Sequence, residues 1–389
     1  MTRTITVGID IGTTATRVAV LEWQKDAEIP KVIGTGAAES KGVRHGYITD
    51  TTLAAGCIKK AVAAAEQSAG IRIRRAVLAL SGIGVASELA VGSAVIAKPD
   101  GEITALDITK AVNEAEEQID ITNRKIIYAS PTLYRLDGKE IVGRPIGMHG
   151  VKLDVRTLFV TVLSQHLEDL LSAASEAGVE AIDVIPSALA GGMMALSEKQ
   201  KIAGSLLIDI GAEETSLAVF ENNVLVGLAV GKIGSADITN DIALGLKISL
   251  EEAEAVKIES MITNHSRKKL DEIIDARLSD IFELADAYLR KIKRSGLLPA
   301  GVTAIGGGSS LPKVAALAKE YLGLPARLGA PDGWAGDRSK IKDSSWFVAF
   351  GLALSVRGAS GDAAESQSFK KSFGGMKKSL KSLFNQFLP

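Results

Sequence analysis

The fold is decided by two stretches of this sequence, Val7-Gly8-Ile9-Asp10-Ile11-Gly12 and Leu206-Leu207-Ile208-Asp209-Ile210-Gly211. They lie 199 residues apart, so Asp10 matches Asp209, Gly12 matches Gly211 and Thr16 matches Thr215 without a gap. In each copy an apolar run, a turn containing glycine and a second apolar run predict a β-hairpin. Two equivalent hairpins so far apart predict a duplicated domain with a cleft between the copies.

The composition is typical of an α/β protein. The chain has 389 residues, of which 46% are hydrophobic and 23% charged, with 39 glycines and 10 prolines. This balance excludes collagen, a disulfide scaffold and a mainly disordered chain. The formal net charge of −1 argues against nucleic acid as a partner.

Cysteine content and apolar runs predict where the protein resides. Cys57 is the single cysteine and cannot form an internal disulfide, which favours a reducing cytosol. No apolar run approaches the roughly 18 residues needed to cross a membrane. The N-terminal residues lack the core of a signal peptide. We therefore expect a cytosolic protein without a membrane span.

Helical patterns occupy the intervals between the predicted strands. We expect helices over 53–68, 164–176 with Ser164 as its cap, 250–258 opened by the capping box of Ser249 and Glu252, 270–293, and 312–321 beginning at Pro312. A turn at 221–224 leads into a third strand, 225–230. Between Gly82 and Val162, short β-rich runs surround one helix near 108–118, which predicts an inserted α+β module.

These patterns divide the chain into six parts. We expect a first domain over 1–81 and 163–199, the inserted module over 82–162, and a second domain over 200–357 with a helical part at about 238–300. The small polar residues of 358–368 predict a flexible linker. Residues 369–389 form the last part.

The two hairpin turns have the chemistry of a phosphate site. Their backbone N–H groups can cradle phosphate oxygens, while Asp10 and Asp209 can orient hydrated Mg²⁺. A third loop, Gly306-Gly307-Gly308, would allow close contact with a flat ligand, although it also fits an ordinary strand-to-helix turn. Glu254 and Lys257 share one helix face, and a solvent-exposed ion pair is the alternative for them.

The last twenty residues have an amphipathic pattern. Aromatic and aliphatic residues recur at helical spacing, with lysines on the other side or beside them: Phe373, Met376, Lys377, Lys378, Leu380, Lys381, Leu383, Phe384 and Phe387. This composition is typical of a helix that lies in the interface of an anionic membrane. A terminal helix docked on the protein's own surface is the alternative.

Taken together, the two D-I-G hairpins, the GGG loop and the inserted module resemble the actin/Hsp70/sugar-kinase ATPase superfamily. Within it the chain is most similar to the bacterial cell-division family FtsA. The stretches that carry this resemblance are 39–46 (ESKGVRHG), 79–82 (ALSG), 144–151 (RPIGMHGV), 238–243 (ITNDIA), 252–257 (EAEAVK) and the terminal helix. The resemblance implies ribonuclease-H-like actin domains and an SHS2-type inserted subdomain.

The resemblance also implies a function and site residues. An FtsA-like protein binds ATP and Mg²⁺, forms filaments on the inner face of the cell membrane during septum formation, and anchors the tubulin-like FtsZ (the Z ring) there. Arg277 matches a basic position that would meet the acidic FtsZ tail, and other division proteins would meet the inserted module. The implied nucleotide contacts are Asp10, Gly12, Thr13, Thr14, Asp209, Gly211, Thr215, Gly234, Glu254, Lys257, Gly306, Gly307 and Gly308, with both aspartates near Mg²⁺.

Two departures from the family pattern alter this expectation. Ala212-Glu213-Glu214 stands where the family has Gly-Gly-Thr, so the carboxylates would repel phosphates unless they point away or contact metal, and the loop would use Thr215 instead. Ile185 stands where the superfamily's ATPases orient the attacking water, so we expect an ATP-binding scaffold with at most slow hydrolysis. A pilus-assembly scaffold like PilM, which has a similar non-glycine loop, is one alternative. A soluble kinase or chaperone ATPase of the same fold is the other.

Overall fold

Both repeated sequences form the first strand of a hairpin, as their apolar runs predict. The computed structural model describes residues 4–24, 29–258, 267–331 and 341–358. In it, β1 (Thr4–Ile11) pairs antiparallel with β2 (Ala15–Trp23), and β12 (Ser205–Ile210) pairs in the same way with β13 (Thr215–Glu221). Ile11 lies opposite Thr16 and Ile210 opposite Thr215, so the two turns have equal length.

Each hairpin is extended into a five-stranded sheet of the same order. The first sheet runs β11-β6-β1-β2-β3 and the second β16-β15-β12-β13-β14. In both, two antiparallel pairings are followed by parallel ones. This duplication confirms the predicted actin-like fold class. The added strands are β3 (Lys31–Glu39), β6 (Arg75–Leu80), β11 (Glu180–Pro186), β14 (Val224–Gly231), β15 (Val302–Ile305) and β16 (Ala326–Leu328).

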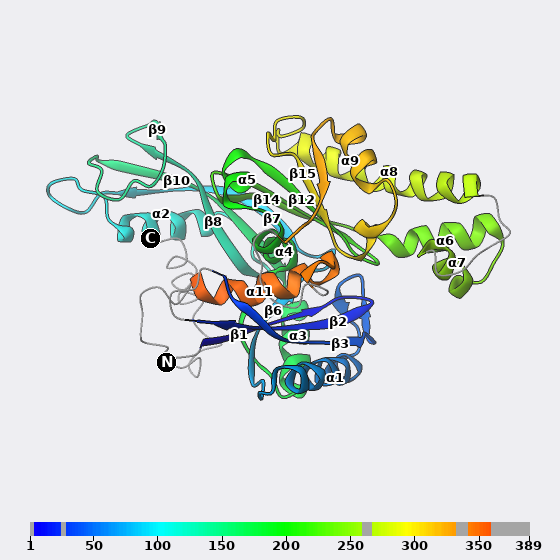
Figure 1. Ribbon diagram of the computed structural model, residues 1–389. Coiled ribbons are helices and arrows are strands. Elements are labelled where there is room, and N and C mark those ends of the chain that lie inside the picture. The colour runs from blue at the N-terminus through cyan, green and yellow to red at the C-terminus, as the bar shows by residue number, and fades with distance from the viewer. Residues whose placement is uncertain (1–3, 25–28, 259–266, 332–340, 359–389) are drawn as a thin grey trace.

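Helices separate the two sheets and cover their outer sides. Helix α4 (Ser187–Ala195) packs against α11 (Phe347–Gly358), and the pair lies between β1 of one sheet and β12 of the other (Figure 1). On the outside, α1 (Thr51–Ala69) and α3 (Ser164–Glu176) cover the first sheet, while α8 (Arg267–Lys291) and α9 (Val314–Leu322) cover the second. We call these halves the first and second lobe.

Smaller elements complete the two lobes. Helices α6 (Ser235–Leu246) and α7 (Leu250–Lys257) extend the second lobe away from the inserted module (Figure 1). Ser249 and Glu252 form the predicted capping box of α7. The remaining short elements are β4 (Val43–Arg44), β5 (Tyr47–Ile48), α5 (Glu198–Ala203), and the 3₁₀ turns η1 (Gly307–Ser310) and η2 (Ser344–Trp346).

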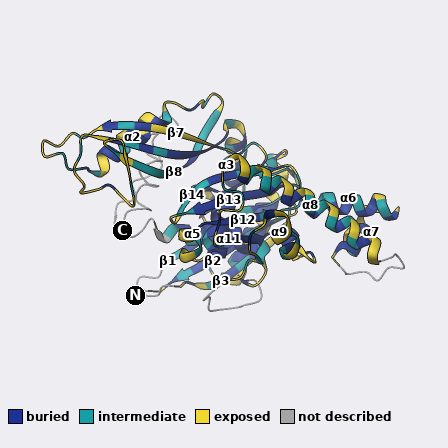
Figure 2. Cartoon of the chain, turned by 90° about the horizontal axis from the view of Figure 1, so that it is seen from above, coloured by how far each residue is buried: buried dark blue, intermediate teal, exposed yellow. Residues whose placement is uncertain are grey.

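The inserted module is a separate sheet with one helix. Its strands are ordered β7-β10-β8-β9, and α2 (Ala105–Glu116) packs on β7 and β10. The module has its own hydrophobic cluster, in which Phe159 is fully buried, distinct from those of the two lobes. Figure 2 shows buried residues along the sheets and exposed residues on the outer helices. The strands are β7 (Ala86–Val95), β8 (Arg124–Leu136), β9 (Lys139–Ile141) and β10 (Lys152–Leu163).

The structure differs from the sequence prediction in several local details. The inserted helix expected near 108–118 spans Ala105–Glu116, the long helix expected over 270–293 spans Arg267–Lys291, and α5 was not predicted. Ser164 is the first residue of α3, and the cap is Leu163, which makes no side-chain cap bond. Helix α9 begins at Val314, because Lys313 has a positive φ of 64° and ends the preceding turn. Strand β9 was not predicted, since three residues are too short for a visible alternation.

Candidate nucleotide-binding cleft

The turns after β1 and β12 border one cavity between the lobes, with a volume of about 430 Å³. Helix α7 and the turns η1 and η2 also contribute to its walls. The cavity brings together residues that are far apart in the sequence. Those that the sequence predicted are Asp10, Gly12, Thr13, Thr14, Asp209, Gly211, Glu254, Lys257, Gly306, Gly307 and Gly308.

Two carboxylates meet on the floor of this cleft. Burial raises the pKa of Asp10 to about 6, although the charge of Arg17 opposes the shift. The pKa of Asp209 rises to about 7 because of burial and then the negative charges of Asp10 and Glu214. A neighbouring cation would relieve this repulsion, which is the property expected of a site for Mg²⁺ held by phosphates and water. Among the described residues, no group of three or more His, Cys, Asp or Glu could hold a metal alone.

The GGG loop approaches the second aspartate closely. A Cβ atom on Gly306 would lie 2.3 Å from Asp209 Oδ1, and Gly306 has a φ of 86°. Only glycine fits both conditions without strain. The glycine requirement at this position therefore comes from the contact with Asp209, as well as from the turn itself.

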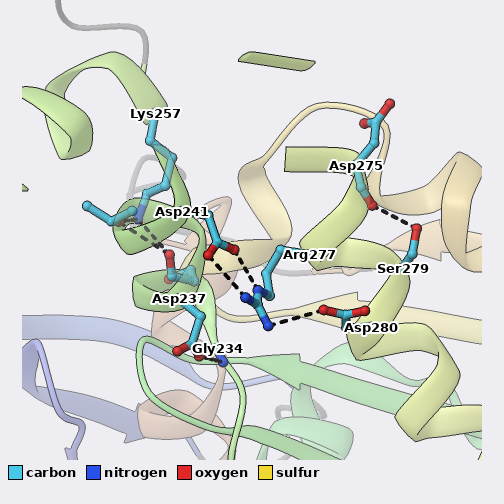
Figure 3. A network of polar contacts seen from close by, with 10 residues as sticks. Gly234, Asp237, Asp241, Lys257, Asp275, Arg277, Ser279 and Asp280 are labelled. Carbon is cyan, nitrogen blue, oxygen red and sulfur yellow. Dashed lines mark hydrogen bonds and ion pairs between the residues drawn. The ribbon is translucent and has the colours of Figure 1, made fainter. Parts of the chain in front are cut away.

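Glu254 and Lys257 form an ion pair on α7, but Lys257 is not solvent-exposed as the simpler alternative supposed. Lys257 Nζ lies 2.6 Å from Glu254 Oε2, and its side chain is only 6% exposed. The same Nζ donates to Thr239 Oγ1 at 2.8 Å and to the carbonyl of Ser235 at 3.1 Å. These bonds fix α7 to α6, and Figure 3 shows Lys257 directed at α6. Both Glu254 and Lys257 line the cleft.

Thr215 and Gly234 differ from the expectation, since neither lines the cleft. Thr215 is fully buried and donates its hydroxyl to the carbonyl of Ile233 at 2.7 Å. Its side chain is therefore engaged inside the second lobe and does not replace the missing Gly-Gly-Thr hydroxyl. Gly234 caps α6, where its N–H donates to Asp237 Oδ2 at 2.8 Å, and it packs against the backbone of Ala212.

The two carboxylates of the second turn take different directions. Glu213 points away from the cleft: its Oε2 accepts the backbone N–H of His45 at 2.7 Å, and its Oε1 lies 3.0 Å from Arg44 Nε. Glu214 lines the cleft and accepts the hydroxyl of Ser81. Burial raises the pKa of Glu214 to about 7, with Asp10 adding to the shift and Ser81 opposing it.

Several residues of the cleft were missed by sequence reasoning. Arg17 is the clearest case, because the register of the first hairpin places it opposite Asp10. The hairpin predicted from the sequence already pairs Asp10 with the residue seven positions later, so this register would have identified Arg17. Ile185 lies in the first lobe's core and does not line the cleft. Ala212 and Glu214, which the sequence analysis placed in the second turn, also line the cleft. The other lining residues that were not predicted are Ile11, Gly46, Ser81, Ser187, Ser235, Ile258, Ser310, Leu311, Pro312, Ser344, Ser345 and Val348.

Arg277, the predicted contact for an acidic tail, lies on α8 in a network of acids. Its Nε and Nη2 donate to Asp241 of α6 at 2.7 and 3.1 Å, and its Nη1 donates to Asp280 at 3.1 Å (Figure 3). The bond to Asp241 raises the pKa of Arg277 further. Its side chain is 31% exposed.

Gly358, the first residue of the predicted linker 358–368, is the last residue of α11. The rest of that linker and the predicted membrane helix, residues 369–389, lie outside the described residues. Within the part of the chain that the structure describes, no helix has the length and apolarity needed to cross a membrane.

Residues 206–351 match the model of the family "Cell division protein FtsA", and residues 84–161 match that of the "SHS2 domain inserted in FTSA". The second match falls on the inserted module, β7 to β10. Together the two matches cover the second lobe and the insertion.

Curated relatives agree with these models. The FtsA proteins of Bacillus subtilis and Streptococcus pneumoniae are 30% and 32% identical to this chain, over 89% and 84% of it and 82% and 75% of their own lengths. FtsA of Pseudomonas aeruginosa is 28% identical over 90% of this chain and 88% of its own.

Solved structures share the fold at lower identity. The PilM-PilN type IV pilus biogenesis complex contains a chain with a TM-score of 0.68 and 21% identity, covering 90% of this chain and 97% of that one. MreB5 of Spiroplasma citri bound to ADP has a TM-score of 0.51 and 15% identity, covering 90% and 95%. At these identities the likeness is one of fold alone, so it does not favour the PilM alternative. The family models and the curated relatives place the chain in the FtsA family of cell division proteins.

Proposed function

We propose that this cell division protein binds ATP with Mg²⁺ in the cleft between its lobes, forms filaments at the inner face of the cell membrane and anchors FtsZ there. One observation carries the nucleotide part: two matching Asp-Ile-Gly turns line the same cavity, and each contributes an aspartate and a glycine to its wall. A single such turn is common, but two that converge on one volume fit a ligand with several phosphates.

Each part of the cleft has a role in this proposal. The backbone and hydroxyls of Gly12, Thr13 and Thr14 contact the phosphates, while Asp10 and Asp209 orient water around the ion. Mg²⁺, when bound, neutralises phosphate charge. Glu254 and Lys257 on α7 approach the ribose and the adenine, and the backbone of 306–308 packs over the adenosine.

Nucleotide acts here as a conformational ligand. Ile185 is buried and apolar, so it cannot orient an attacking water from the position that superfamily ATPases use. We therefore propose slow turnover, in which bound nucleotide sets the polymerisation state. A head-to-tail contact between copies is heterologous and open-ended, which yields filaments.

The membrane and FtsZ parts rest on the family and on two sequence features. The five lysines and the aromatic residues of 369–389 suit anionic lipid, and Arg277 offers a guanidinium to the acidic FtsZ tail. The inserted module offers a separate surface for other division proteins. In this arrangement the protein is peripheral, located at the division site.

Liposome pelleting tests the anchoring directly. The full chain should pellet with vesicles that contain anionic lipid, whereas the chain without 369–389 should remain in the supernatant. A matched control of full length, Leu380→Asp with Phe384→Asp, removes the apolar face but keeps every lysine, and it should also remain in the supernatant. Pelleting of the truncated chain, or none of the full chain, would contradict the anchoring role.

The same assay tests the partner. A peptide with the sequence of an FtsZ C-terminal tail should pellet only with vesicles that carry the full chain, and Arg277→Ala should reduce the amount. Equal capture by Arg277→Ala and the unmodified chain would remove Arg277 from the proposed contact while leaving the membrane result unaffected.

A further inference from the structure

Glu214 joins the two lobes inside the cleft. It lies in the turn after β12, in the second lobe, but its Oε1 accepts the hydroxyl of Ser81 at the end of β6 in the first lobe. Its other oxygen, Oε2, is shielded from solvent and accepts no hydrogen bond from the residues that the structure describes. An ionised carboxylate accepts hydrogen bonds and cannot donate one, so this face of Glu214 presents negative charge that only a cation or an N–H or O–H donor would stabilise.

The backbone of the first lobe is shaped around this side chain. Gly46 has a φ of 77°, and a Cβ atom there would lie 2.7 Å from Glu214 Oε2 and 2.5 Å from the Cα of Gly82. Any side chain at position 46 would therefore push Glu214 and Gly82 apart. The carboxylate is enclosed by Gly46, Ser81 and Gly82, and only 9% of the residue is exposed.

The adjacent carboxylate provides a contrast. Glu213 is held outside the cleft by Arg44 and by the backbone N–H of His45. In the internal repeat, Glu214 aligns with Ala15, which has a single methyl group. Apart from Asp10 and Asp209, Glu214 is thus the one acidic residue of the two turns that lines the cavity.

The position of Glu214 relates to the length of the ligand. In the proposed function the nucleoside contacts α7 and the phosphates contact the two turns. Glu254 and Lys257 are bonded to α6, whereas Glu214 contacts Gly46 and Ser81, two lining residues from other loops of the first lobe. A phosphate chain that starts at α7 and passes between the turns therefore ends near Glu214.

We propose that Glu214 makes the cleft discriminate against the third phosphate of a nucleotide. This inference rests on the proposed nucleotide binding and deepens it. A nucleoside diphosphate ends before Glu214 and leaves the Glu214–Ser81 contact intact. A terminal phosphate carries the same sign of charge as the ionised form of Glu214 and competes with it for the Ser81 hydroxyl, so a triphosphate separates the lobes at this point.

Equilibrium affinities of ADP and ATP, each measured with Mg²⁺, test the proposal on the full chain. The unmodified chain should bind ADP more tightly than ATP. Glu214→Thr, which restores the family residue, should shift the ratio of the two dissociation constants towards ATP by about tenfold, as expected for directly interacting groups. Glu213→Gln, in the same turn but outside the cleft, should leave the ratio unchanged.

A second variant keeps the inference testable if Glu214→Thr does not fold. Glu214→Gln keeps the shape of the side chain and should shift the ratio in the same direction. Ratios within twofold of the unmodified chain in both Glu214 variants would overturn the inference while leaving nucleotide binding intact. Failure of every variant to bind either nucleotide would instead overturn the proposed nucleotide binding, and this inference with it.

Discussion

The turn after β1 and the turn after β12 have nearly the same backbone and very different side chains. In both, the glycine after the Asp-Ile pair packs against the carbonyl of the residue three positions on: a Cβ on Gly12 would lie 3.1 Å from the Ala15 oxygen, and one on Gly211 would lie 2.9 Å from the Glu214 oxygen. The first turn continues Thr13-Thr14-Ala15, and the second Ala212-Glu213-Glu214. The duplicated fold has thus kept its geometry while its two turns have acquired different chemistry.

The difference extends to the aspartates. Arg17 lies opposite Asp10 in the hairpin register, whereas Ser216 lies opposite Asp209. Asp209 is also close to the charge of Glu214. Burial raises the pKa of both aspartates and Arg17 opposes the shift in both, but the charges of Asp10 and Glu214 raise the pKa of Asp209 further, to about 7 against about 6 for Asp10. The first turn has its own cation, while the second has an excess of negative charge that a metal ion would balance.

The largest effect is expected from a substitution that disrupts the contact between the second turn and the first lobe. Gly46→Ala should lower the free energy of unfolding by about 2–5 kcal/mol, the sum of a left-handed backbone cost and of overpacking against Glu214 and Gly82. The matched control is Gly70→Ala, since Gly70 has a φ of 68° but nothing within 4 Å of its Cβ position. It should lose only about 1–2 kcal/mol. Equal losses in urea unfolding would show that the lobes are not in contact there.

The second prediction asks whether both turns serve one ligand. Asp10→Asn and Asp209→Asn should each weaken binding of ATP in the presence of Mg²⁺ by about 10- to 100-fold, the range for groups that orient a metal's ligands. Without Mg²⁺ the difference from the unmodified chain should shrink, because loss of a carboxylate also removes repulsion. Calorimetric titration measures both. A loss confined to one variant would mean that only one turn contacts the ligand.

The third prediction uses the raised pKa of Asp209. An acid whose pKa is raised by folding stabilises the fold below its ordinary pKa near 4, and that stabilisation is lost as the pH rises through about 7. The nucleotide-free chain should therefore lose part of its stability between pH 5 and pH 8, and Asp209→Asn should lose less. The Tm of the variant relative to that of the unmodified chain should rise across this range, by less than the value of about 2–4 °C per kcal/mol expected for chains of roughly 150–250 residues. A difference in Tm that is constant with pH would contradict the shift.

The smallest expected effect concerns Glu213, the carboxylate of the second turn that lies outside the cleft. Arg44→Ala removes the ion pair with Glu213, but the Arg44 side chain is 67% exposed. Such pairs contribute about 0–1 kcal/mol, so the unfolding midpoint should barely move. A loss well above 1 kcal/mol would indicate that Glu213 holds the lobes together as strongly as Glu214 does.

Sequence reasoning predicted the elements where the pattern is local. The hairpins, the strand after Asn222 and Asn223, and the capping box of Ser249 all follow from residues within a few positions of one another. Sequence reasoning misplaced the starts of α3 and α9, which it put after Ser164 and at Pro312. At both places more than one nearby residue could begin the helix. A local pattern does not decide between such starts, because the energies of adjacent caps differ by less than the packing that selects one.

The sequence by itself determined that the chain is a duplicated α/β protein with two Asp-Ile-Gly turns directed at one cleft. Hydrophobic periodicity and an exact spacing of the repeat are sufficient for that. Only the tertiary structure decided what the second turn does with its two carboxylates. Their directions depend on Arg44, His45 and Ser81, which are more than 130 positions away in the chain, so no pattern near Glu213 and Glu214 could encode them.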